Sequence, residues 1–176
     1  LINPAKLKNL VYENPIQKNA GLDVYEAPQK DHNYLITVDV ARGLGNDYSA
    51  FIVFDITNFP YKAVAKYRNN EIKPMLFPSI IADVGKAYNK AFILCEVNDI
   101  GDQVASILNY DLEYDNLLMC SQRGRAGQVV GAGFSGKRSQ LGVRTTQAVK
   151  KLGCSNLKTL LEDDKILIID YDIISE

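Results

Sequence analysis

The chain has 176 residues, a formal net charge of −1 and 47% apolar residues. This length suffices for one domain with a substantial core, and the apolar content excludes a wholly disordered chain. No apolar run reaches the roughly 18 residues of a membrane span, and no signal-peptide pattern opens the sequence. The near-zero net charge neither requires nor excludes nucleic acid, because local charged patches matter more than totals.

The first third of the chain predicts an antiparallel group of strands. Residues 1–33 are rich in Pro and Asn and predict an irregular approach, with a short extended piece near 22–25. A turn at 43–47 contains glycines suited to positive φ. The third predicted strand alternates apolar and polar residues, so we expect one of its faces to be exposed. The three strands, in chain order, are 34–39, 49–55 and 61–68.

The remainder predicts alternating helices and strands. The first expected segments are a helix opened by Pro74 and Pro78, a buried strand at 91–95 parallel to the first, and a helix from about Asp99. A short strand at 117–119 and a basic loop or hairpin at 121–140 should follow. The chain should then form helical segments at about 143–152 and 157–162 and a last strand at 165–170. Three antiparallel strands followed by such an alternation predict an α/β protein. Its mixed sheet, flanked by helices, has the element order of the ribonuclease H-like fold.

Two carboxylates close two apolar strands that we expect to be neighbours. Asp39 follows the first strand and Glu96 follows the parallel strand. A lone ionised carboxylate in such a place is costly unless something pairs with it, and two that converge suit Mg²⁺ or Mn²⁺. Asp47 adds a third candidate acid on the intervening turn. The alternative is structural: Asp39 caps its turn, Asp47 forms one, and Glu96 is an acid at a helix start.

The sequence offers few residues for a zinc site or for a nucleophilic catalytic triad. His32 is the only histidine, which argues against a His-based zinc site and a Ser-His-Asp triad. The three cysteines (Cys95, Cys120 and Cys154) are odd in number and widely spaced. We interpret them as small core residues in a reducing compartment rather than as a disulfide framework or a zinc site.

A basic, glycine-rich stretch follows residue 120. Its cations, together with one slightly further on, are Arg123, Arg125, Lys137, Arg138 and Arg144. Such a cluster predicts sequence-independent contacts to a phosphate backbone, although a solvated surface loop is the alternative. Residues 131–137 satisfy most of a P-loop pattern, but Arg138 stands where a Ser or Thr should hold Mg²⁺. We therefore do not predict a nucleotide site.

These motifs resemble a known family. The residues that carry the resemblance are the runs YLITVDVARG (34–43), GNDYSA (45–50), ILCEVN (93–98), GVRTT (142–146) and ENPIQ (13–17). Together they are similar to the nuclease domain of the large terminase subunit of tailed bacteriophages, with the T4-like branch the closest match. The similarity runs through essentially the whole chain.

The resemblance implies a ribonuclease H-like endonuclease that cuts concatemeric double-stranded viral DNA during genome packaging in the host cytoplasm. It implies that Asp39 and Glu96 bind Mg²⁺ or Mn²⁺, two ions in the complete site, with Asp47 in support. It also implies a separate ATPase domain, a portal and a small terminase subunit as partners, and no membrane. We place Arg42 near the scissile phosphate and expect Lys137, Arg138 and Arg144 to hold the DNA backbone.

We expect residues 1–176 to form a single nuclease domain, truncated at both ends. The family's third metal-binding Asp lies on a helix after the last strand, and the chain stops at Glu176, before such a helix could form. We do not assign that role to Asp170 or Asp172, so the isolated chain should be weak or inactive. One alternative is a non-catalytic DNA-binding or motor-docking module. Another is an actin-like phosphotransferase, which would need paired phosphate loops that the sequence lacks.

Overall fold

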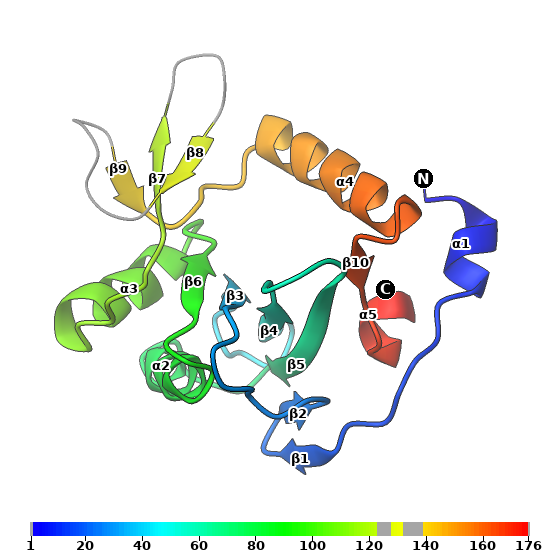
Figure 1. Cartoon of the computed structure of the whole chain (residues 1–176). Helices are drawn as coiled ribbons and strands as arrows, with labels where there is room; N and C mark the ends of the chain where they lie inside the picture. The colour runs from blue at the N-terminus through cyan, green and yellow to red at the C-terminus, as the bar shows by residue number, and fades with distance from the viewer. Residues whose placement is uncertain (1, 123–127, 132–138, 176) are drawn as a thin grey trace.

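The computed structural model describes residues 2–122, 128–131 and 139–175, and its centre is a seven-stranded mixed sheet (Figure 1). The strand order is β1-β2-β5-β4-β3-β6, and β10 also pairs with β5. The strands are β1 (Gln17–Asn19), β2 (Leu22–Val24), β3 (Tyr34–Asp39), β4 (Ser49–Asp55), β5 (Tyr61–Asn69), β6 (Phe92–Cys95) and β10 (Ile166–Leu167). The predicted α/β class with ribonuclease H-like order is confirmed.

The central strands pair as predicted. β3, β4 and β5 form an antiparallel meander, and β6 pairs parallel with β3. Alternate side chains of these strands bury one face of the sheet, including Ile36, Val38, Phe51, Val53 and Ile93. This face forms the core with α2 (Phe77–Ala87), α3 (Gly101–Ser106) and the π-helical turn η1 (Ile107–Asp111) that continues α3.

The helix predicted from the two prolines is α2, and the apolar residues along one of its faces pack into the core. Ile81 and Val84 are buried one turn apart, and the Phe77 ring stacks on Phe51 with centroids 6.0 Å apart. Side chains three and four positions apart share one face of a helix. The apolar side chains that alternate along the strands therefore pack against the apolar face of α2 in one core.

The third strand of the meander differs from the prediction. We expected β5 to have an exposed face, but its residues 63–67 are all buried, and Lys66 is only 6% exposed. The Lys66 ammonium lies 2.6 Å from Asp170 and 2.7 Å from Asp172, in the C-terminal segment. The polar residue within this strand, Lys66, is therefore buried in an ion pair and does not face solvent.

The N-terminal approach is more regular than predicted. It contains the helix α1 (Pro4–Lys8) and the hairpin β1-β2, which extends the sheet because β2 pairs with β5. Asn3 begins α1 by accepting a hydrogen bond from the Ala5 amide. The extended piece predicted near 22–25 is confirmed as β2, whereas the expectation of an irregular 1–33 is wrong for α1 and β1.

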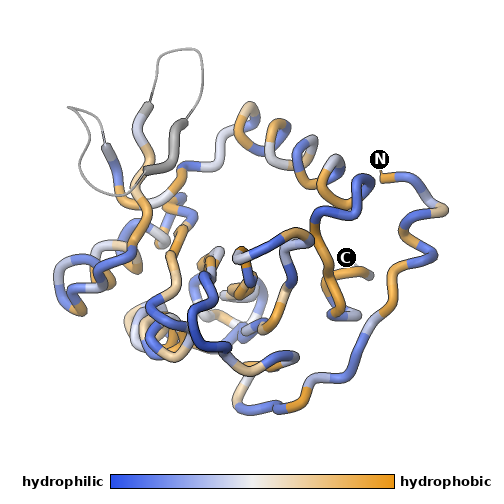
Figure 2. The backbone as a smooth tube through the Cα atoms, viewed as in Figure 1, coloured by the Kyte–Doolittle hydropathy of each residue, from blue (hydrophilic) through white to orange (hydrophobic). Residues whose placement is uncertain are grey.

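The C-terminal part also departs from the prediction. One helix, α4 (Gln147–Glu162), replaces the two predicted helical segments, and apolar and polar residues alternate around it (Figure 2). The last predicted strand shrinks to β10, and a short helix, α5 (Tyr171–Ser175), forms where none was expected before residue 176. In the described part of the chain, no helix has the length and apolarity needed to cross a membrane.

The predicted basic hairpin lies in a second, small sheet. It has the order β8-β7-β9, formed by β7 (Met119–Gln122), β8 (Gln128–Gly131) and β9 (Ser139–Leu141). The short strand predicted at 117–119 begins instead at Met119, with Leu117 bridged to Ile93 of β6. This small sheet stands beside the carboxyl end of β6 (Figure 1).

Candidate functional site

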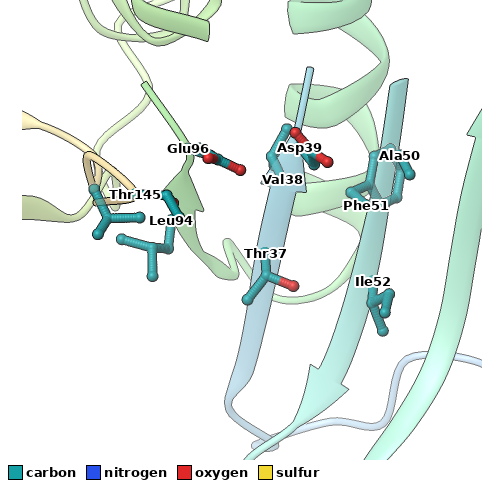
Figure 3. A pocket seen from close by; sticks show the side chains of 10 residues that line it. Thr37, Val38, Asp39, Ala50, Phe51, Ile52, Leu94, Glu96 and Thr145 are labelled. Carbon is teal, nitrogen blue, oxygen red and sulfur yellow. The ribbon is translucent and has the colours of Figure 1, made fainter. Parts of the chain in front are cut away.

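Two acidic side chains meet at the carboxyl ends of β3 and β6. Val38 and Cys95 are register partners, and the Glu96 amide donates to the Val38 carbonyl at 2.9 Å. Asp39 and Glu96 are therefore neighbours on adjacent strands and project from the same face of the sheet. Figure 3 shows both carboxylates at the same end of the cleft, with the Glu96 side chain extending toward Asp39. The structure thus brings together the two acids that the sequence singled out.

The pair lies at the rim of a cleft of about 290 Å³. Its walls are Thr37, Val38, Asp39, Ala50, Phe51, Ile52, Leu94, Glu96, Val143 and Thr145. The floor is largely apolar, and the charged groups stand at one end (Figure 3). The cleft is open, so a large substrate could reach the carboxylates.

The environment of Asp39 disfavours its negative charge. Partial desolvation by the surrounding strand ends raises the pKa of Asp39, and the negative charges of Glu96 and, to a smaller extent, Asp47 raise it further. A like charge at close range disfavours the ionised form of a carboxylate. A divalent cation between the two carboxylates would reverse this effect, and carboxylate oxygens are what Mg²⁺ and Mn²⁺ prefer. The donor set therefore fits a hard cation.

Asn98 holds the Glu96 carboxylate and was missed in the sequence. Its side-chain amide donates to Glu96 Oε1 at 2.9 Å and to the Thr145 carbonyl at 3.0 Å. The two bonds fix one oxygen of Glu96 and join the end of β6 to the segment before α4. An Asn two residues after a strand-terminal Glu carries no pattern that would have identified this contact.

Two glycines allow the backbone to close around Glu96. A Cβ on Gly142, whose φ is +71°, would lie 2.2 Å from the Cys95 carbonyl oxygen. A Cβ on Gly101 would lie 2.0 Å from the Glu96 carbonyl oxygen. Val143 donates to the Cys95 carbonyl at 2.8 Å across the same approach. Glu96 is therefore placed by close backbone packing on both sides.

Asp47 lies on the same side of the molecule but is not part of the pair. It lines an adjacent cleft with Asp39 and Arg42, and its charge contributes to the raised Asp39 pKa. Among the described residues, no three acidic, His or Cys side chains are close enough together to hold one ion. The assignment of Asp47 as a supporting acid stays a prediction.

The basic residues divide into two groups. Arg42 donates to both carboxylate oxygens of Asp99, at 2.8 and 2.6 Å, and this pairing lowers the pKa of Asp99. Arg144 is exposed between Val143 and Thr145, which line the cleft. The other four predicted contacts, and the P-loop-like run, are in a stretch whose side chains lie outside the described residues: Arg123, Arg125, Lys137, Arg138 and 131–137.

The other acids, the cysteines and the histidine that the sequence singled out make contacts of a different kind. Asp170 and Asp172 face Lys66 rather than the Asp39 and Glu96 pair. Cys95 and Cys120 are buried free thiols, as predicted for core cysteines, whereas Cys154 is exposed on α4. The single histidine, His32, pairs with Asp55 at 2.6 Å, near the start of β3 and the end of β4.

Known proteins share this architecture. The large terminase nuclease of thermophilic phage G20c with bound magnesium superposes with a TM-score of 0.70 at 19% identity, covering 97% of this chain and 75% of that one. The large terminase nuclease domain of Thermus phage P74-26 gives 0.66 at 22% identity, covering 98% and 74%. The human cytomegalovirus terminase nuclease domain, Mn soaked and inhibitor bound, gives 0.52 at 10% identity, covering 97% and 79%.

At these identities the solved structures establish the fold alone. Membership of a family comes from the sequence, because the family model for the terminase RNaseH-like domain matches residues 36–175. That range contains both strand-end acids and most of the chain. The chain therefore belongs to the terminase RNaseH-like domain family.

Proposed function

We propose that this chain is the divalent-metal-dependent endonuclease domain of a phage terminase large subunit, which cleaves concatemeric double-stranded DNA during genome packaging. The observation that supports this most directly is the convergence of Asp39 and Glu96 at the rim of an open cleft. Membership of the terminase family supplies the biological setting.

Asp39 and Glu96 would hold the metal. Mg²⁺ commonly uses only one or two carboxylates and takes its other ligands from water and substrate phosphates, so two carboxylates suit a site that also binds DNA. The ion would supply an activated water and stabilise the leaving oxygen of a phosphodiester. Bound magnesium, cobalt and zinc in structures of the phage G20c nuclease support a divalent ion, and we propose Mg²⁺ or Mn²⁺ here.

The remaining roles concern the substrate and the packaging machine. Arg144 stands beside the cleft and would contact the DNA backbone, as would Arg123, Arg125, Lys137 and Arg138, which precede it in the sequence. Arg42 would approach the scissile phosphate by exchanging Asp99 for DNA. We further propose the ATPase domain, the portal and the small terminase subunit as partners, and the host cytoplasm as the place of action.

Cleavage of plasmid DNA by the protein with its ATPase domain, in Mg²⁺ and Mn²⁺, tests the proposal. Asp39→Asn and Glu96→Gln should each lower the cleavage rate by at least about a hundredfold, because each removes a metal ligand. The matched control is Asp102→Asn, which neutralises an exposed acid in the first turn of α3 and should leave cleavage unchanged. Cleavage by Asp39→Asn at the wild-type rate would contradict the proposal.

A non-catalytic DNA-binding module on the same fold remains the competing function, because the described residues bring two acids together and not three. A calorimetric Mn²⁺ titration separates the two functions. The endonuclease requires Mn²⁺ binding that Glu96→Gln abolishes, whereas a module that only binds DNA requires neither.

A further inference from the structure

A row of four residues crosses the sheet at the level of the acidic pair. Asp39 of β3 is the register partner of Ala50 of β4, and Ala50 is the partner of Arg68 of β5. Glu96 completes the row beside Asp39. Residues opposite one another on paired strands point to the same face. At about 4.8 Å between strands, the Arg68 backbone lies about 10 Å from that of Asp39.

The member of the row between the acids and the arginine is small and neutral. Ala50 lines the cleft of Asp39 and Glu96 and also a second cleft of about 350 Å³. Tyr48, Lys66 and Arg68 line that second cleft together with the acids Asp47 and Asp172. The two clefts share walls at residues 50–52 and therefore adjoin along the row. Within the row, only the small side chain of Ala50 stands between the carboxylates and the arginine.

Arg68 is the cation of the second cleft suited to bind a phosphate. Its guanidinium lies 3.9 Å from the ring centroid of Tyr48, which is 42% exposed. Stacking on an aromatic face orients the plane of a guanidinium, and a planar guanidinium binds phosphate through two parallel N–H donors. Lys66 is less accessible to a ligand, because it is buried and only 6% exposed.

We propose that Arg68, positioned by Tyr48, binds a backbone phosphate of the same DNA whose scissile phosphate lies at Asp39 and Glu96. This inference rests on the proposed function and deepens it, because it assigns a second anchoring point on the substrate path. The contact is to the phosphodiester backbone and so carries no base preference. Its effect belongs to substrate binding and not to metal binding.

Fluorescence anisotropy with a short labelled duplex tests the inference, with the protein in EDTA to prevent cleavage and the salt concentration varied. Arg68→Ala should raise the dissociation constant about tenfold and lower the salt slope by about 1. Tyr48→Ala should weaken binding less and keep the slope, because the charge remains. The matched control is Lys86→Ala, which removes an exposed charge from α2 on the opposite side of the sheet and should change neither quantity.

Wild-type DNA affinity and salt slope in Arg68→Ala would overturn the inference. If Arg68→Ala does not fold, Arg68→Lys takes its place, and there the salt slope should persist while affinity falls severalfold through loss of the bidentate contact. Wild-type affinity in Arg68→Lys would then overturn it. Mn²⁺ affinity should be unchanged in every Arg68 variant, and its loss would show a merely structural role. Failure of the endonuclease proposal is separate, since it appears as cleavage by Asp39→Asn.

Discussion

Single residues explain why this sheet edge suits a cation. Asp39 and Glu96 could be predicted because each directly follows an apolar strand, and the parallel pairing of those strands brings them together. Asn98 could not, because its contact with Glu96 depends on how the turn after β6 folds. Arg68 escaped prediction for a related reason: its relation to Asp39 passes through two strand pairings, and the sequence alone does not specify their register.

The Asn98 contact leads to the first prediction. Asn98→Ala removes the amide that donates to the Glu96 carboxylate and to the Thr145 carbonyl, so Mn²⁺ affinity measured by calorimetry should fall about tenfold or more, as is usual when a partner of a metal ligand is lost. Asn116→Ala is the matched control, because the side-chain amide of Asn116 donates to the Lys90 carbonyl near the start of β6, at the end of the strand away from Glu96. Equal Mn²⁺ affinity in wild type and Asn98→Ala would contradict the positioning role.

At the scale of elements, short-range pattern predicted some features and long-range packing decided others. The bounds of β3 and β4 agree with the predicted strands because their apolar patterns are local. The predicted interruption between 152 and 157 is wrong, because a glycine inside a helix lowers helix stability by only about 1 kcal/mol relative to alanine. Thr146 caps α4 by accepting a hydrogen bond from the Val149 amide. The buried face of β5 was missed because it depends on residues about a hundred positions away.

Two glycine-to-alanine substitutions should change the free energy of unfolding in opposite directions. Gly142→Ala places a Cβ against the Cys95 carbonyl at a positive φ, so we expect a loss of roughly 2 kcal/mol in unfolding free energy and weaker Mn²⁺ binding through displacement of Glu96. Gly153→Ala meets nothing within 4 Å on α4 and should gain about 0.5–1 kcal/mol. Urea unfolding measures both. A stabilising Gly142→Ala would contradict the close packing described around Glu96.

At the scale of the whole molecule, a buried charge cluster joins the C-terminal segment to β5 and to the residue that follows β2. Lys66 of β5 pairs with Asp170 and Asp172 near the C-terminus, and Tyr25, which follows β2, donates to Asp170. Burial by itself raises the pKa of Asp170, but the hydrogen bonds from Lys66 and Tyr25 outweigh it and lower the pKa. This cluster supports the wall of the cleft that contains Arg68.

The cluster predicts an acid-sensitive stability. Because the folded-state pKa of Asp170 is below its unfolded value, its contribution is present at neutral pH and is lost as the pH falls through the folded pKa. Asp170→Asn should therefore cost about 3 kcal/mol at pH 7, with a smaller deficit in acid, as measured by urea unfolding across pH. The control Asp164→Asn removes an exposed partner of Lys6 and should cost less than about 1 kcal/mol. A pH-independent deficit for Asp170→Asn would contradict this linkage.

The sharing of one metal ion by Asp39 and Glu96 is tested most directly by a crystal structure of the protein soaked in Mn²⁺, with anomalous data. We predict a Mn²⁺ peak within about 2.5 Å of a carboxylate oxygen of each residue, absent from a Glu96→Gln crystal treated in the same way. A soaked wild-type crystal with no anomalous peak between the two carboxylates, in protein that cleaves DNA with Mn²⁺, would contradict it.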